Sequence, residues 1–153
     1  MSSQPRSEYE VIAKIRAYAL KLKLSKDDAD FLEKDLLPKI ENLGLLDDSL
    51  YAKNYVAQSL VSKKNPSSLV IKRFLAKKGI SRELIQDALA SYPQEIAQDF
   101  AYAQAKKKFN LLQKSKTPRS TILIKKKIFA YLQSKGFQSS VIVPAIDRVL
   151  NVK

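Results

Sequence analysis

Apolar residues recur along most of the chain at spacings of three and four, which places them on one face of an α-helix. Ala52, Val56 and Leu60 form one such stripe, and Ile85 and Leu89 belong to another. Alternation at a period of two, the mark of a half-buried β-strand, is absent. The pattern therefore predicts an all-α fold.

The three glycines of the chain each follow an apolar helical stripe and precede an apolar residue. Helices often end at a glycine in the left-handed conformation. The apolar residue after the glycine then packs on the residue four positions before the glycine. We therefore expect three helices to end in the same way. The predicted pairs are Ile40 with Leu45 around Gly44, Leu75 with Ile80 around Gly79, and Leu132 with Phe137 around Gly136.

Capping residues mark the expected helix starts. Asn65-Pro66 and Thr117-Pro118 each place a capping residue before a proline, which is favoured at the first helical position. Ser81 is expected to cap the helix that follows it. Pro144 lies where the last helix is expected, so that helix either begins later, near Val143, or is kinked.

Asp47 and Asp48 stand between the glycine of one helix end and the apolar stripe that begins at Leu50. A carboxylate at this position accepts hydrogen bonds from the free N–H groups of the first turn, and the helix dipole favours its neighbour. Both aspartates are therefore expected to cap a helix. The alternative, a metal or acid–base pair, has no nearby residue to complete the site.

Residues 71–89 align with residues 128–146 at a constant offset, which matches Gly79 with Gly136. Each copy follows a longer helical stripe, so the unit is expected to hold three helices in about fifty residues. Such a unit buries its apolar face only by stacking on its neighbours. The predicted repeats are a shortened first one at 1–46, a second at 47–92 and a third at 93–153.

The chain of 153 residues contains neither cysteine nor histidine. This excludes disulfides, thiolate nucleophiles, imidazole bases and soft metal sites, so we expect no cofactor and no enzymatic activity. The formal net charge is +13 and the pI is near 9.8, which favours a polyanionic partner, nucleic acid before membrane. No apolar run approaches the roughly 18 residues of a membrane span, and no leader segment is visible, so we expect a cytoplasmic protein.

The positive charge is concentrated, because no Asp or Glu occurs from Phe100 to Ile146. Successive residues of a lysine triplet lie about 100° apart on a helix, so they do not all face one partner. Tyr51, Tyr55, Phe74 and Tyr131 could stack on bases, but their stripe positions favour core packing. The candidate contacts with a polyanion are Lys63, Lys64, Lys72, Arg73, Lys77, Lys78, Lys106, Lys107, Lys108, Lys125, Lys126 and Lys127.

Three motifs together resemble the RecX family, the bacterial regulators of the RecA recombinase. The most specific is the run from Gly44 to Asp48 followed by Tyr51-Ala52. The segments Leu75-x-x-Lys78-Gly79-Ile80 and Leu132-x-x-Lys135-Gly136-Phe137 are similar to the later repeat motifs of that family. The resemblance covers the chain from about Ala17 to Leu150, but the first repeat lacks the usual glycine turn.

The resemblance implies an all-α protein of tandem three-helix repeats that forms a short, curved solenoid. It also implies binding in the groove of a RecA filament on single-stranded DNA, with modulation, and by expectation inhibition, of recombinase, ATPase and coprotease activity. A monomer is expected.

Two alternatives remain open. One is a basic helical module that binds single-stranded or double-stranded DNA alone, and the other is a nuclease that holds a metal at Asp47 and Asp48.

Overall fold

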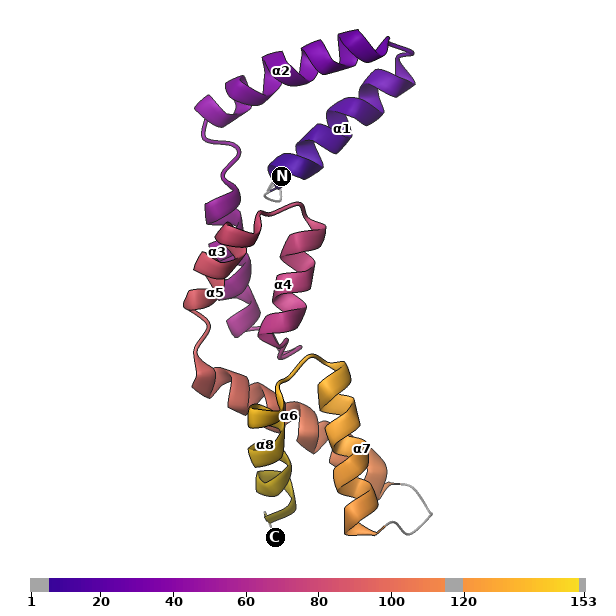
Figure 1. The fold of residues 1–153 in the computed structure, drawn as a ribbon, viewed down its shortest axis with the longest axis vertical. Coiled ribbons are helices and arrows are strands. Elements are labelled where there is room, and N and C mark those ends of the chain that lie inside the picture. Colours follow the sequence, from indigo (N-terminus) through magenta and orange to yellow (C-terminus); the bar gives the residue numbers. More distant parts are fainter. Residues whose placement is uncertain (1–5, 115–119, 152–153) are drawn as a thin grey trace. The chain divides into compact units, whose positions relative to one another are not determined.

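The computed structural model describes residues 6–114 and 120–151. Eight α-helices, and no strand, occur in this part of the chain (Figure 1). The prediction of an all-α fold is confirmed. The helices are α1 (Glu8–Lys21), α2 (Lys26–Asn42), α3 (Asp48–Leu60), α4 (Ser68–Lys77), α5 (Arg82–Ala90), α6 (Gln94–Gln113), α7 (Thr121–Ser134) and α8 (Ser139–Asn151).

The chain divides into two compact units. The N-terminal unit comprises Met1–Tyr55 and Phe74–Ala88, and the C-terminal unit comprises Val56–Arg73 and Leu89–Lys153. Helices α3, α4 and α5 therefore contribute residues to both units. The predicted division into three repeats concerns copies in the sequence, and it stays a prediction.

The core of the C-terminal unit forms where α6 packs on both α7 and α8. Ala101 and Ala105 of α6 are fully buried there, and their small side chains let the helix axes approach closely. Ile128 and Leu132 of α7 and Ile142 of α8 have no exposed surface either. The sequence pattern thus places its apolar stripes on the faces that meet.

The predicted helix ends at Gly79 and Gly136 are confirmed. Both glycines have positive φ, at 80° and 82°. The N–H of Ile80 donates to the carbonyl of Leu75 over 3.1 Å, and the N–H of Phe137 donates to that of Leu132 over 3.2 Å. Because all four of these apolar side chains are buried, each turn also joins the core. 

Gly44 ends α2 with the same backbone geometry but without the packing. Its φ is 67°, and the N–H of Leu45 donates to the carbonyl of Ile40 over 3.1 Å. Leu45 is nevertheless 67% exposed, so the expected apolar contact contributes little here.

A further turn of the same kind follows α1, and the sequence analysis missed it. Lys23 has a φ of 56°, and the N–H of Leu24 donates to the carbonyl of Ala19 over 3.0 Å. The first repeat therefore lacks the glycine of this turn but keeps the turn itself. Glycine is preferred in the left-handed region but is not required there. A lysine at positive φ therefore gives no signal in the sequence.

With this turn recognised, the α1–α2 pair and the α7–α8 pair share one register with an offset of 113 residues. Helix α1 runs from 8 to 21 and α7 from 121 to 134, and α2 and α8 begin at 26 and 139. Ser7 and Ser120 both cap the first helix of their pair. The α1–α2 pair therefore corresponds to the last two helices of the three-helix arrangement formed by α6, α7 and α8.

A buried serine attaches the start of one helix to a glycine turn in each unit. In the N-terminal unit the Ser7 hydroxyl donates to the carbonyl of Lys78, next to Gly79. In the C-terminal unit the Ser67 hydroxyl donates to the carbonyl of Lys135 over 2.8 Å, next to Gly136. Each hydroxyl also caps its own helix, since it accepts from the N–H of the third helical residue. We call this contact the serine joint.

The serine joint explains why glycine occupies the turn. A Cβ on Gly79 would overlap the Cβ of Tyr9, and a Cβ on Gly136 would lie 2.9 Å from the Ser67 hydroxyl oxygen. Around Gly44 a Cβ would meet no atom within 4 Å. Gly79 and Gly136 are thus needed both for backbone conformation and for close approach, whereas Gly44 is needed only for conformation.

Two predicted helix starts are wrong. Asn65 does not cap α4 but has a φ of 48°, and Ser67 caps the helix instead, because its hydroxyl is held at the serine joint. Helix α8 begins at Ser139 and runs through Pro144, so the later start is wrong too. The buried neighbours of Pro144, such as Ile142 and Ala145, keep this segment helical despite the missing N–H.

The expected cap at Ser81 is confirmed, since its hydroxyl accepts from the N–H of Leu84 over 3.3 Å. Thr117-Pro118 lies outside the described residues. Helix α7 is capped by Ser120, whose hydroxyl accepts from the N–H of Leu123 over 3.3 Å.

Gly79→Ala and Gly44→Ala form a matched pair that separates the two requirements. Both place an alanine at positive φ, which costs about 1–2 kcal/mol. We expect Gly79→Ala to lose at least about 1 kcal/mol more in urea unfolding, because its Cβ must also displace Tyr9. Equal losses in the two variants would show that the serine joint does not require the close approach.

Candidate functional site

Ten of the twelve predicted basic contact residues are exposed in the structure; only Lys78 and Lys108 are half-buried. Lys63 and Lys64 lie in the turn after α3, and Lys72, Arg73 and Lys77 lie on α4. The two lysine triplets lie on α6 and α7 of the C-terminal unit. 

Lys78 is engaged within the N-terminal unit. Its ammonium forms an ion pair with Glu10 and lies 5.5 Å from the centre of the Phe74 ring. The hydrogen bond from Lys78 lowers the pKa of Glu10 and raises the pKa of Lys78 itself. Its backbone carbonyl also accepts the serine joint. A structural role for Lys78 is thus better supported than a contact with a partner.

Basic residues from α6 and from the turn after α7 gather around Tyr131 in the C-terminal unit. The ammonium groups of Lys108 and Lys135 lie 5.3 and 5.6 Å from the centre of the Tyr131 ring. The ring itself is fixed, because its hydroxyl donates to the Gln104 side chain over 3.0 Å. Lys135 was not among the predicted contacts. In the sequence, Lys135 is recognisable only as the lysine directly before a glycine. Lys78 occupies the equivalent position, but it is engaged within the protein.

Gln104 ties this cluster to the turn after α3. It is only 8% exposed, and its side-chain amide donates to the carbonyl of Lys64 over 2.6 Å. The backbone of Lys64 is therefore fixed beside the ring that Lys108 and Lys135 cover. We call Lys64, Lys108 and Lys135 the Tyr131 cluster; the structure places it on residues of the C-terminal unit alone.

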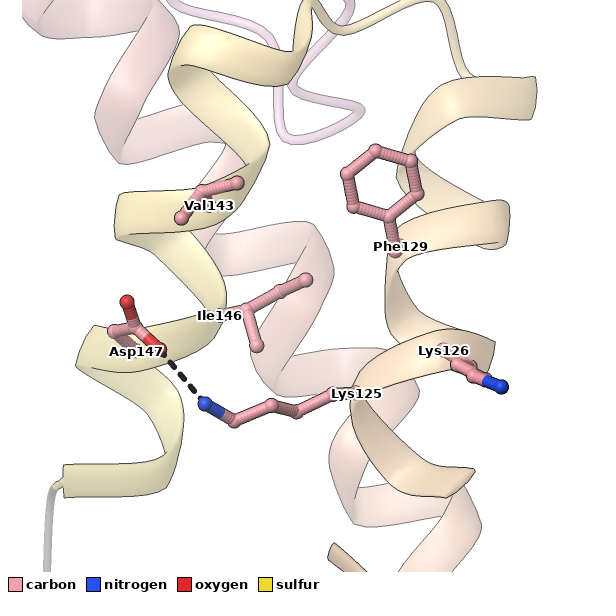
Figure 2. Close-up of a pocket in the computed structure, with 6 residues that line it drawn as sticks. All are labelled: Lys125, Lys126, Phe129, Val143, Ile146 and Asp147. Carbon is pink, nitrogen blue, oxygen red and sulfur yellow. Dashed lines mark hydrogen bonds and ion pairs between the residues drawn. The ribbon is translucent and has the colours of Figure 1, made fainter. Parts of the chain in front are cut away.

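A groove of about 390 Å³ lies between α7 and α8 in the same unit. Phe129, Val143 and Ile146 supply its apolar surface (Figure 2). Lys125 reaches across to Asp147, with 3.1 Å between the ammonium nitrogen and a carboxylate oxygen. Lys126, which also lines the groove, points away from Asp147 in Figure 2.

Both carboxylates that border the acid-free segment are paired. Asp147 binds Lys125, and Asp99 binds Arg148 with 3.0 Å between nitrogen and oxygen. Exposed pairs of this kind contribute little stability, but they reduce the repulsion that a free carboxylate would exert on an approaching anion. Lys106, Lys107 and Lys127 thus remain exposed on a surface with few competing negative charges.

Asp47 caps α3, as predicted, and Asp48 lies in the first turn of that helix. The Asp47 carboxylate accepts from the N–H of Leu50 over 2.8 Å. The Asp48 carboxylate accepts from the N–H of Glu8 over 3.0 Å and so fixes the start of α1. Among the described residues, no group of three or more potential acidic ligands could hold a metal ion.

The four aromatic residues that were considered for base stacking pack within the protein, as their stripe positions predicted. The Tyr55 and Phe74 rings stack with centroids 4.1 Å apart and planes 7° from parallel. Tyr51 is half-buried, and burial raises the pKa of its phenol. These rings are therefore poorly placed to stack on bases.

These features define a class of protein. Helix pairs in a common register are typical of a helical-repeat protein, and this one has exposed basic clusters on its surface. No helix in residues 6–114 and 120–151 has the length and apolar character needed to cross a membrane. 

The chain is 31% identical over 132 residues to the regulatory protein RecX of Clostridium beijerinckii, an alignment that covers 86% of this chain and 59% of that protein. It resembles the crystal structure of RecX from Lactobacillus salivarius with a TM-score of 0.78 and 27% identity, over 97% of this chain and 88% of that one. A second crystal structure of regulatory protein RecX gives a TM-score of 0.77 and 25% identity, over 94% and 66%. No protein-family model matches.

The chain belongs to the RecX family of regulatory proteins. It spans about half to three fifths of the length of the curated relatives that it matches. 

Asp47→Ala tests the capping role. Loss of the side-chain acceptor leaves the first turn of α3 with unpaired N–H groups, and we expect unfolding to require about 1 kcal/mol less free energy. Urea denaturation measures this loss. Asp47→Ser, which restores a capping oxygen, should recover most of it; a variant that unfolds as easily as Asp47→Ala would contradict the assignment.

Glu10→Gln tests the ion pair through its pH dependence. Since the folded-state pKa of Glu10 lies below the ordinary value of 4.5, the carboxylate stabilises the fold above that pH and loses this effect as pH falls through the folded pKa. We expect Glu10→Gln to lower Tm at neutral pH and to reduce the fall in Tm between about pH 6 and about pH 3. The exposed Glu41→Gln is the control, and an unchanged pH profile for Glu10→Gln would refute the coupling.

Proposed function

We propose that the chain binds RecA filaments assembled on single-stranded DNA and inhibits their recombinase, ATPase and coprotease activities. Membership of the RecX family supports a regulatory role. The cationic surface of the C-terminal unit is the observation that carries the proposal. A RecA filament on DNA presents phosphates and acidic protein surface, both of which this surface would attract.

The Tyr131 cluster and the two lysine triplets are the proposed contact residues of this unit. They lie on a scaffold fixed by Gln104, so their backbone positions are set before a partner arrives. Preorganised charges lose less conformational entropy on binding than charges on a mobile loop. Lys63, Lys72, Arg73 and Lys77 are proposed as further contacts.

Regulation follows from binding and needs no catalytic group in this chain. A protein that contacts several filament subunits at once gains affinity from each of them. If it fits one filament state better than another, it shifts the population towards that state, and it can block the subunit motion that ATP turnover requires. The proposal includes a three-repeat division at 1–46, 47–92 and 93–153, a monomer, and a location in the cytoplasm with the DNA.

The second candidate function is DNA binding without RecA, which the net charge of +13 favours. Neutralisation of about six phosphates would make the affinity for single-stranded DNA fall with salt at a log–log slope of roughly −4 to −5. Fluorescence anisotropy with a labelled oligonucleotide measures that slope. If affinity for DNA alone matches the affinity for the RecA–DNA filament, this second function is favoured.

Lys107→Glu/Lys126→Glu/Lys127→Glu tests the first function. All three lysines are exposed and lie on α6 and α7. We expect the wild type to suppress ATP turnover by RecA on single-stranded DNA, and the triple variant to require roughly tenfold more protein or more for the same effect, since reversal of three contacts adds repulsion.

The matched control is Lys21→Glu/Lys26→Glu/Lys34→Glu, which makes the same change in net charge on exposed residues of the N-terminal unit. Equal losses in both triple variants would mean that net charge alone matters. If saturating wild-type protein leaves ATP turnover and strand exchange unchanged, the proposal is wrong.

A further inference from the structure

The α7–α8 groove is apolar at positions where the α1–α2 pair is charged. The offset of 113 residues matches Phe129 of α7 with Arg16 of α1. It also matches Ile146 of α8 with Glu33 of α2. Arg16 and Glu33 form an ion pair over 2.8 Å, and the Arg16 side chain is 61% exposed. The α1–α2 pair thus carries an exposed ion pair where the α7–α8 pair carries an aromatic ring and an aliphatic side chain.

The α4–α5 pair is polar at the matched positions too, although helices precede and follow it in the chain. The alignment that superimposes the two glycine turns matches Phe129 with Lys72. It also matches Val143 with Gln86. Lys72 and Gln86 are both exposed. A helix pair with neighbours on both sides in the sequence therefore keeps these positions exposed, so contact with a further helix pair does not account for the apolar residues of the groove.

The shape and chemistry of the groove suit an apolar side chain. Val143 is 51% exposed and Phe129 is half-buried, whereas Ile146 is only 5% exposed. A volume of about 390 Å³ lies at the lower end of those that hold small ligands, and it has room for a large side chain. A nucleic-acid base fits less well, because the donors and acceptors along its edge would find no partner among aliphatic side chains.

The charges around the groove select an acidic occupant. Residues 121–151 contain five basic side chains and a single carboxylate side chain, that of Asp147. Asp147 is paired with Lys125, whereas the exposed Lys126 points away from Asp147 (Figure 2). A carboxylate of a partner would therefore be attracted to Lys126, while a second copy of a chain with net charge +13 would be repelled.

We propose that the α7–α8 groove binds an acidic segment of a protein partner through one apolar anchor residue. The anchor contacts Phe129, Val143 and Ile146, and a carboxylate beside it in the partner pairs with Lys126. An apolar anchor in a pocket, with charged neighbours at its edge, is the usual arrangement of a strong protein contact. The proposal does not rest on the proposed binding of RecA or DNA, and its test leaves Lys126 unchanged.

The probe is a fluorescein-labelled peptide with a central phenylalanine flanked by glutamates on both sides. We expect saturable binding to the full chain by anisotropy, and roughly tenfold weaker binding when serine replaces the phenylalanine. Phe129→Lys installs the residue found at the matched position of α4. It should weaken binding by roughly tenfold even though it adds a positive charge, because the apolar contact is lost.

Leu111→Lys is the matched control. It makes the same change in charge at a residue of α6 that is 66% exposed and does not line the groove, so we expect equal or slightly tighter binding. Val143→Gln, which installs the residue of α5 at an exposed position, is a second groove variant that leaves the net charge unchanged. It should weaken binding by roughly threefold or more, and it decides the test if Phe129→Lys does not fold.

Each other outcome overturns the proposal. Absence of binding, or equal binding of the serine peptide, would show that the groove accepts no apolar anchor. Tighter binding to Phe129→Lys would show that charge alone attracts the peptide. If Phe129→Lys instead weakens binding of a single-stranded oligonucleotide, the groove holds a base, and if sedimentation shows a dimer that Val143→Gln dissociates, the occupant is a second copy. Inhibition of RecA by the wild type, measured separately, reports only on the proposed function.

Discussion

The serine joint is the contact on which the rest of the structure depends. Ser7 and Ser67 are buried, and each hydroxyl both donates to the carbonyl before a glycine and accepts from the first turn of its own helix. A buried hydroxyl that uses both functions leaves no unsatisfied polar group. Because the hydroxyl must reach the carbonyl, the turn has no room for a Cβ at Gly79 or Gly136. Serine and glycine positions that look independent in the sequence are two halves of one contact.

This way of holding helices together leaves the cationic residues available. The serine joint uses hydroxyls and backbone carbonyls, and the core uses aliphatic side chains. The ammonium groups of most lysines are therefore not needed to hold the helices together. Lys78 is engaged within the protein, because Glu10 and Phe74 both contact its ammonium. Since the chain has no histidine, its positive charge stays nearly constant between about pH 5 and pH 8. The surface is therefore suited to steady attraction of a polyanion rather than to pH-dependent release.

The helices and most of their ends were predictable from local sequence signals. The contacts between residues distant in sequence were not. Gly79 and Asp47 carry their conformational roles in their residue type, so both predictions are confirmed. Ser67 caps α4 in place of Asn65 because of a hydrogen bond to Lys135, 68 residues away, which no local rule contains. The engagement of Lys78 by Glu10 spans the same distance. The basic clusters were visible as charge runs, but their convergence on Tyr131 depends on the packing of α6 and α7.

The two left-handed turns on which a helix start docks both have glycine, whereas the turns without such a contact have either glycine, at Gly44, or lysine, at Lys23. Gly79 and Gly136 receive serine joints and exclude a Cβ, while Lys23 holds the same backbone conformation in an exposed turn. A lysine in the left-handed region costs about 1–2 kcal/mol relative to glycine, a cost that is tolerable only where no helix must approach. The Lys23 turn thus shares its backbone conformation with Gly79 and Gly136 but not the docked helix start that excludes a Cβ at those two glycines.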